Sequence, residues 1–142
     1  MALDLAAVKG TFFDRAAIVE KLDPAVKKAL SKFGAFVRQR SRTSIRQKKG
    51  TSPAGQPPYS HTGALKKFIF FGYDPGTKSV VIGPTLAGSQ SGAPAALEQG
   101  GPARLSEKTK TRTVLVRARP YMKPAFDAEL GKVGNDFRNL IT

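Results

Sequence analysis

The stretch Asp23–Arg46, DPAVKKALSKFGAFVRQRSRTSIR, decides the fold that the sequence predicts. Its apolar residues recur at helical spacing, at Val26, Leu30, Phe33 and Val37. Such spacing is typical of a helix with one side packed on a core. Asp23 is a favoured N-cap residue and Pro24 suits the first helical position. The pattern therefore predicts an amphipathic helix of roughly 22 residues, preceded by a short helix from Asp14.

The opposite side of this predicted helix is strongly cationic. No acidic residue lies between Asp23 and Asp74, and this stretch holds eleven of the chain's 24 Lys and Arg residues, in a chain of net charge +14. A block of one sign repels itself and favours an external polyanion or an acidic protein surface. We interpret it as a nucleic-acid or acidic-partner face; a merely solvated basic surface is the plainer alternative. The residues of this face are Lys28, Lys32, Arg38, Arg42, Arg46, Lys48 and Lys49.

Length and composition favour one globular domain, residues 1–142, because 142 residues with 40% hydrophobic content can bury one modest core. The chain has no Cys, so it forms no disulfide and offers no thiolate metal ligand. No apolar run approaches the roughly 20 residues of a membrane span. The first residues lack the basic and apolar regions of a secretory signal. We expect a protein made in the cytoplasm, with no membrane partner.

The rest of the chain alternates irregular stretches with short elements. After the helical region 1–46, Gly and Pro mark a loop over 47–63. Lys66–Tyr73 and Lys78–Gly83 read as strands joined by a tight turn at Asp74–Thr77, a hairpin within 66–83. A second loop covers 84–110, and a strand over Arg112–Ala118 and a helix opened by Pro124 fill 111–142.

This order predicts the α+β class: a small antiparallel sheet, made of the hairpin and one further strand, packed with the long basic helix and the C-terminal helix. Loops longer than about 12–15 residues are usually functional or disordered. We expect the two long loops to become ordered only against neighbouring subunits.

The residues of a catalytic centre are missing from the sequence. His61 is the only histidine and has no Cys or carboxylate near it in sequence, so a hydrogen bond within its loop is the favoured role. The few acidic residues form no close pair for general acid–base catalysis. No phosphate-binding loop or dinucleotide fingerprint is present. We predict a protein that is not an enzyme and has no cofactor and no metal.

The aromatic residues of the first predicted strand allow two interpretations. Phe68, Phe70, Phe71 and Tyr73 resemble a platform for stacking bases. However, they fall on both faces of a strand, which is typical of residues divided between a core and an interface. We favour the core and interface interpretation by about four to one over base stacking.

Four motifs follow one another along the chain in a characteristic order: Ser52–Leu65 (SPAGQPPYSHTGAL), Ser79–Pro84 (SVVIGP), Leu97–Gly101 (LEQGG) and Arg117–Phe126 (RARPYMKPAF). This succession resembles the minor tail protein Z and neck (tail-completion) family of long-tailed, lambda-like bacteriophages. The resemblance runs from about Phe33 to Phe126, which is most of the chain.

The resemblance implies a small α+β structural subunit in a ring of six copies at the head–tail junction of a virion. Its partners would be copies of itself, the head-completion or connector proteins, and the tail terminator or tube proteins. Its role would be to complete the tail and join it to the filled head. The motif residues expected at assembly interfaces are Gly55, Pro57, Pro58, Tyr59, Thr62, Gly63, Leu65, Leu97, Glu98, Gly100, Arg119, Pro120, Met122 and Pro124.

Charge gives the ring a second expected role. Six copies of Arg38, Arg42 and Arg46 would form a belt of roughly eighteen positive charges that holds double-stranded DNA through its phosphates, without sequence preference. The same face could meet an acidic patch on another virion protein, and both options stay open. The alternative function is a free-standing, sequence-independent nucleic-acid-binding protein. A small nuclease or toxin-like enzyme is a weaker third option.

Overall fold

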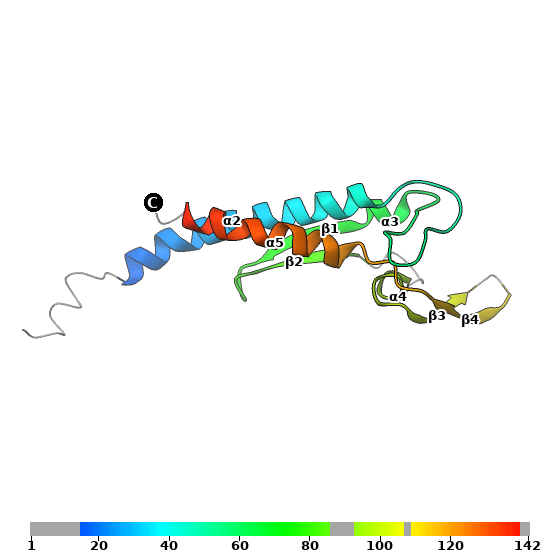
Figure 1. Ribbon diagram of the computed structural model, residues 1–142. Coiled ribbons are helices and arrows are strands. Elements are labelled where there is room, and N and C mark those ends of the chain that lie inside the picture. The colour runs from blue at the N-terminus through cyan, green and yellow to red at the C-terminus, as the bar shows by residue number, and fades with distance from the viewer. Residues whose placement is uncertain (1–14, 86–92, 107–108, 140–142) are drawn as a thin grey trace, which may run out of the picture.

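A long helix, α2, runs along most of the molecule in the computed structural model, and the other elements are arranged around it (Figure 1). The structure describes residues 15–85, 93–106 and 109–139; predictions that fall on the other residues lie outside it. The elements are α2 (Arg15–Ser44), α3 (Ala64–Lys67), β1 (Ile69–Asp74), β2 (Ser79–Pro84), α4 (Ala93–Gln99), β3 (Gly101–Ser106), β4 (Thr111–Val116) and α5 (Met122–Arg138). The α+β class predicted from the sequence is confirmed.

Helix α2 is continuous through Pro24, so the prediction of two helices separated at Asp23 is wrong. A proline removes one N–H donor and crowds the carbonyl four residues earlier, which weakens a helix without always ending it. Asp23 does not start a helix; its carboxylate lies 2.9 Å from the ammonium of Lys78, beside the β1–β2 turn. None of the helices in the described ranges is long and apolar enough to cross a membrane.

The main core lies between α2, α5 and the β1–β2 hairpin. Phe33, Val37 and Ala125 are buried there, and apolar residues of β2 and α5 pack against them. The rings of Phe33 and Phe126 meet edge to face, with centroids 5.4 Å apart. The apolar stripe predicted in the long helix thus faces the core, as its spacing implied. Gly34 lets α2 approach the hairpin closely, since a Cβ there would lie 2.8 Å from the Phe71 ring.

Strands β1 and β2 form the predicted hairpin, with Phe71 opposite Ile82 and Asp74 opposite Ser79. The predicted turn is confirmed: one oxygen of the Asp74 carboxylate accepts the backbone N–H of Gly76 at 2.9 Å, and the other accepts the Thr77 hydroxyl at 2.8 Å. The first strand begins later than predicted, because Ala64–Lys67 form the single helical turn α3. Ile69 is fully buried, whereas Phe70 on the opposite face is 46% exposed.

A second hairpin, β3–β4, forms a separate two-stranded sheet. The sequence predicted the strand now seen as β4 but placed it in one sheet with the first hairpin, and it assigned β3 to a loop; both predictions are wrong. β3 begins with Gly101 and Pro102, which are weak strand formers, and Pro is tolerated there because the strand pairs on only one side. Figure 1 shows α4 and this hairpin at the end of the molecule where α2 finishes.

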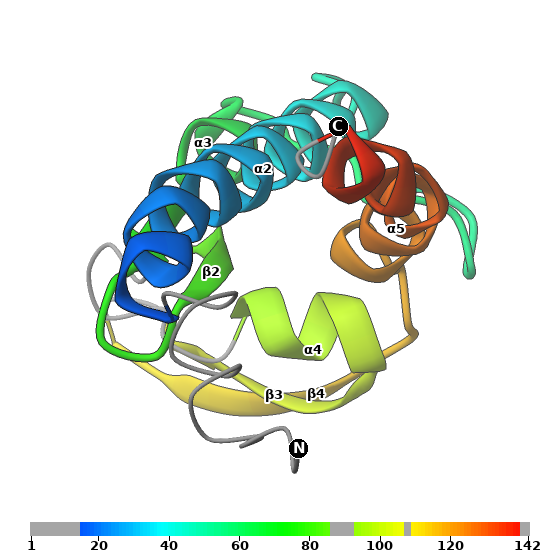
Figure 2. The same ribbon diagram turned by 90° about the vertical axis from the view of Figure 1, so that its left-hand side faces the viewer.

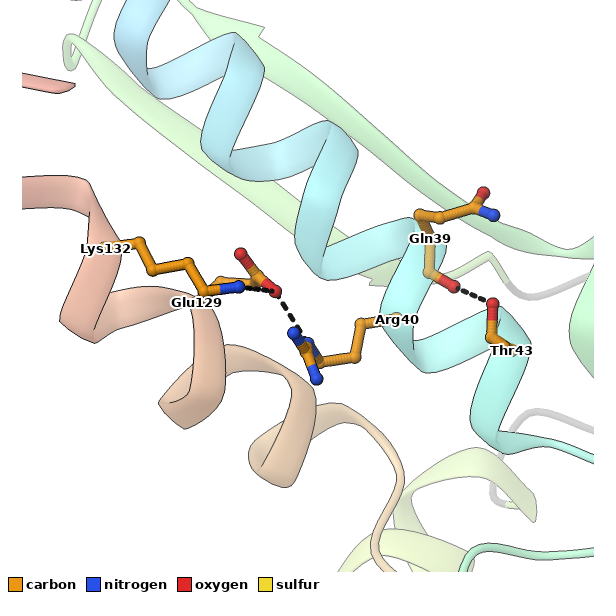
Figure 3. Close-up of polar contacts among 5 residues, drawn as sticks. All are labelled: Gln39, Arg40, Thr43, Glu129 and Lys132. Atoms are coloured by element: carbon orange, nitrogen blue, oxygen red, sulfur yellow. Dashed lines mark hydrogen bonds and ion pairs between the residues drawn. The ribbon is translucent and has the colours of Figure 1, made fainter.

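Helix α5 lies beside α2 and is tied to it by ion pairs. It begins at Met122, two residues before the predicted start at Pro124. Figure 3 shows the Arg40 guanidinium of α2 beside the Glu129 carboxylate of α5, with Nε and Oε1 2.6 Å apart. Lys132 also contacts that oxygen, at 3.3 Å. Glu129 is buried, and the hydrogen bond from Arg40 lowers the pKa of its carboxyl.

Candidate nucleic-acid interface and motif junction

The predicted cationic stripe of α2 does not form one free face. The Lys32 ammonium pairs with Asp136 of α5 at 2.6 Å. Arg38 turns to the other side, where its Nε donates to the backbone carbonyl of Ile69 at 2.8 Å and its guanidinium lies over the Phe70 ring. Six residues separate Lys32 from Arg38, which at about 100° per residue places them about 120° apart around the helix. They therefore extend to the two flanks of α2, where each has a partner within the chain.

Other members of the predicted face keep their charge available. Lys28 is exposed on α2 and Arg42 is half-buried. The helix ends at Ser44, so Arg46 belongs to the following loop, where its backbone pairs with that of Tyr59. The members of the predicted face whose charge stays available are thus Lys28 and Arg42 on the helix and a separate group beyond its end.

That separate group is the basic end, defined as Arg46, Lys48, Lys49, Lys66 and Lys67. The two ends of the loop after α2 are joined, because the backbone N–H of Ser60 donates to the Arg46 carbonyl at 2.9 Å. The Lys48 ammonium lies 5.4 Å from the centre of the half-buried Tyr59 ring. Gln47 lies beside Gly63, the residue before α3. The short helix α3, which ends with Lys66 and Lys67, therefore lies at the same end of the molecule (Figure 1).

Six carboxylates of the described residues are occupied within the chain. Asp23, Asp127, Glu129 and Asp136 pair with Lys or Arg, while Asp74 holds a turn and Glu98 caps a helix. Within the described residues, none of the five side chains of the basic end pairs with a carboxylate. The basic end is therefore a local surplus of positive charge and can accept an external anion.

The third and fourth sequence motifs meet at a single carboxylate. Glu98, near the end of α4, accepts hydrogen bonds from the backbone N–H groups of Tyr121, Met122 and Lys123 at 2.8–3.0 Å. These donors belong to the start of α5, where a helix has no partners of its own for its first N–H groups. A negative charge is also favourable at that end of the helix dipole. Glu98 thus sets where α5 begins.

The first motif joins the same junction through backbone contacts. The Arg119 N–H donates to the Leu97 carbonyl at 2.6 Å, and the Arg119 side chain donates to the Ser52 carbonyl at 2.8 Å. The Gly55 N–H donates to the Ala118 carbonyl at 2.9 Å. The loop 47–63 is thus held by its own chain, so the prediction that it orders only against neighbouring subunits is wrong for this loop.

A small apolar cluster lies inside the junction. Ile45, Ile69 and Tyr121 are almost completely buried there, against Leu65, Leu97 and Met122. The Tyr121 hydroxyl has no hydrogen-bond partner among the described residues. Burial, with a contribution from the Glu98 charge, raises the pKa of Tyr121 to about 12.

The predicted assembly residues are thus largely engaged inside the chain. Gly63 and Gly100 have positive φ angles of 76° and 75°, and a Cβ on Gly100 would lie 3.0 Å from the Ala118 nitrogen. Pro58 is buried, whereas Gly55, Thr62 and Pro124 are exposed; the half-buried members are Pro57, Tyr59, Leu65, Leu97, Glu98, Gly100, Arg119, Pro120 and Met122. Their residue types follow from these internal contacts, and their role in assembly stays a prediction.

Sequence reasoning missed an apolar groove of about 540 Å³ between α5, α2, β2 and the end of α4. Its apolar lining includes Val37, Ile82, Met122 and Phe126. The signal was present in α5, whose apolar residues are too many to be buried by its contact with α2: Ala125 is buried there, whereas Phe126 and Leu130 remain 40% and 48% exposed.

The residues considered for catalysis are not brought together. His61 is exposed, and its side chain makes no hydrogen bond with the described residues. Over the same residues, no group of three or more His, Cys, Asp or Glu side chains could hold a metal ion. Comparisons of the chain with models of protein families, with curated proteins and with solved structures found no significant match.

Proposed function

We propose that this protein is a structural, non-enzymatic subunit of a ring at the head–tail junction of a long-tailed bacteriophage, where it completes the tail and helps to join it to the DNA-filled head. The order of the four motifs supports the family. The observation that carries the DNA-related part of the proposal is the basic end, whose five cations have no carboxylate partner among the described residues, while six described carboxylates are occupied elsewhere.

In this function the basic end faces the channel through which DNA passes. A ring of six copies would gather about thirty such charges, enough to hold duplex DNA through its phosphates without reading its sequence. Tyr59 limits the freedom of Lys48 through its ring contact, which reduces the entropy that the lysine loses on binding. Copies of the chain, the connector or head-completion proteins and the tail terminator or tube proteins are the proposed partners.

The exposed apolar residues support a subunit that acts in an assembly. Val81 is 66% exposed and Leu115 is 79% exposed, and both lie on the outer faces of two-stranded sheets. Exposed apolar side chains on the open face of a sheet are available for contacts with other chains.

The first experiment is electron microscopy of a lysate from a phage whose copy of this gene carries an early stop codon. We expect filled heads and separate tails, with attachment restored when the intact gene is supplied from a plasmid. Infectious particles with attached tails would contradict the proposed function.

The second candidate function is a free-standing, sequence-independent nucleic-acid-binding protein, which the same basic end favours. Salt titration of DNA binding by the purified monomer separates the two functions. The free-standing protein requires micromolar or tighter binding as a monomer, whereas the ring subunit needs several copies to act together. If the basic end contacts an acidic protein surface instead of DNA, the purified protein should show no binding to duplex DNA at any salt concentration.

A further inference from the structure

The β3–β4 hairpin presents an apolar side chain that the described chain does not cover. Leu115 lies opposite Pro102 in the hairpin and is more exposed than any other large hydrophobic residue described. The other face of the hairpin carries the buried Ala103, paired with Val114, and packs toward α4. Leu115 therefore points away from α4 and the body of its own chain.

The groove described above offers apolar surface of the matching kind. Its volume of about 540 Å³ lies within the range of about 300–1,000 Å³ typical of pockets that bury a whole small ligand. It can therefore take up Leu115 together with Pro102. Gln99, at the end of α4, lines one end of the groove. Since the outer face of the hairpin points away from α4, the hairpin cannot fill the groove of its own chain. Figure 2 shows α4 between the hairpin and the two long helices.

Charge favours the same pairing between copies. The hairpin segment 101–118 carries five Lys or Arg residues and a single Glu. The groove is lined by two carboxylates, Glu98 and Asp127, and one lysine, Lys123. The lining of the groove thus carries one more negative than positive charge in a chain of net charge +14, so a basic hairpin meets less repulsion there than on the rest of the surface.

We propose that the β3–β4 hairpin of one copy docks in the α4–α5 groove of the next copy, with Leu115 as the side chain that enters the groove. This contact rests on the proposed ring and identifies the surfaces that build it. Because the two surfaces differ, a docked pair of copies still offers one free hairpin and one free groove. Such head-to-tail contacts continue from copy to copy until the rotation between them closes a ring.

Disulfide trapping tests the contact directly, since the chain has no cysteine of its own. Two proteins are mixed, one carrying Leu115→Cys and the other, with a tag of different mass, carrying Asp127→Cys in the groove. A disulfide between chains of different mass is intermolecular by design and requires Cα atoms within about 7 Å. We expect this mixed disulfide to form at least tenfold faster than one between Leu115→Cys and Ala35→Cys, which is exposed on α2.

A second variant checks the apolar character of the contact. Leu115→Asp is expected to raise the dissociation constant for self-association at least tenfold, as measured by sedimentation or native mass spectrometry. Phe36→Asp is the matched control, because Phe36 is also an exposed large apolar residue but lies on α2 and does not line the groove. Circular dichroism of both variants verifies that they are folded. Equal weakening by both substitutions would overturn the proposal.

The outcomes separate this contact from the proposed function. A ring that forms without the mixed disulfide would keep the function and overturn the contact, leaving the groove to another protein or to a small apolar ligand. The mixed disulfide in a closed pair of chains would support the contact and contradict the ring. Wild-type protein that stays monomeric at all concentrations would overturn the contact.

Discussion

The carboxylate of Glu98 holds the start of α5 by accepting the backbone N–H of Tyr121 at 3.0 Å, across 23 positions of sequence. The same carboxylate accepts the next two N–H groups of the helix. Two motifs that the sequence suggested as contacts between subunits are therefore partners within one chain. The stability of α5, and of the groove that it lines, depends on this residue.

Replacing Glu98 tests that dependence. Glu98→Ala leaves three N–H groups at the start of α5 without their acceptor, so we expect the free energy of unfolding to fall by about 2–3 kcal/mol. Glu98→Gln keeps an oxygen acceptor and loses the charge, so the loss should be smaller. Urea denaturation measures both. Gln99→Ala, at the exposed neighbouring position, is the control, and an equal loss in that variant would contradict the capping role.

Tyr121 gives the protein a dependence on alkaline pH. In the unfolded chain the phenol ionises near pH 10, whereas burial raises its pKa in the folded protein to about 12. Between these values the unfolded state releases the proton first, so the folded state loses stability as pH rises from 10 to 12. Urea midpoints measured across this range test the effect.

The variant Tyr121→Phe should flatten that alkaline loss. It also removes a buried hydroxyl that has no hydrogen-bond partner among the described residues, so we expect stability at pH 7 to rise by about 1 kcal/mol. Comparison with wild type cancels the titration of the lysines, which both proteins share. An unchanged slope above pH 10 would show that the phenol is not the group responsible.

The contribution of the ion pair between Arg40 and Glu129 to stability should be lost at acid pH. The hydrogen bond from Arg40 lowers the pKa of the Glu129 carboxyl below its ordinary 4.5. The stabilisation is therefore present above pH 4.5 and is lost as pH falls through the lower folded value. At pH 7 Arg40→Ala should cost about 1–3 kcal/mol, because Glu129 is buried and loses its closest partner.

Glu129→Gln isolates this effect, since it removes the titrating group and keeps its shape. Its unfolding free energy should vary less than that of wild type below pH 4.5. Asp127→Asn is the matched control on the same helix, where the carboxylate is exposed and pairs only with Lys123. If the two variants show the same acid profile, the buried pair has no special role.

The basic end should determine how DNA binding responds to salt. Each phosphate contact contributes about 0.9 to the slope of log K against log salt concentration for duplex DNA. Arg46→Gln with Lys48→Gln should therefore lower that slope by about 2. The control is Lys78→Gln with Lys123→Gln, which removes the same charge from lysines that pair with carboxylates. Fluorescence titration with a short duplex measures both, and equal slopes in the two variants would exclude the basic end as the contact.

The predictions that succeeded depend on neighbours in sequence. The turn at Asp74–Thr77 followed from its own residue types, and the core side of α2 followed from the spacing of Phe33 and Val37. The hairpin and the α+β class were built from such local patterns. Local signals therefore sufficed for the elements and for the side of the long helix that is buried.

The predictions that failed depend on distant partners. The carbonyl that receives Arg38 belongs to Ile69, and no periodicity in α2 reveals it. Glu98, near the end of α4, acts as a cap only because the fold places the N–H groups at the start of α5 beside it. β3 has a sequence typical of a loop and becomes a strand by pairing with β4. These contacts are set by the folded chain, so the division of the cationic stripe could not be predicted.

The loop 47–63 has a consequence for the order of events during synthesis. Its contacts with a distant part of the chain are with Ala118 and Arg119, more than sixty positions further along. At translation rates of about 5–20 residues per second, those partners are made roughly 3–13 s after Gly55. During that interval Lys48 and Lys49 belong to a segment that lacks these two long-range contacts. The basic end is thus synthesised before all the contacts that position it can form.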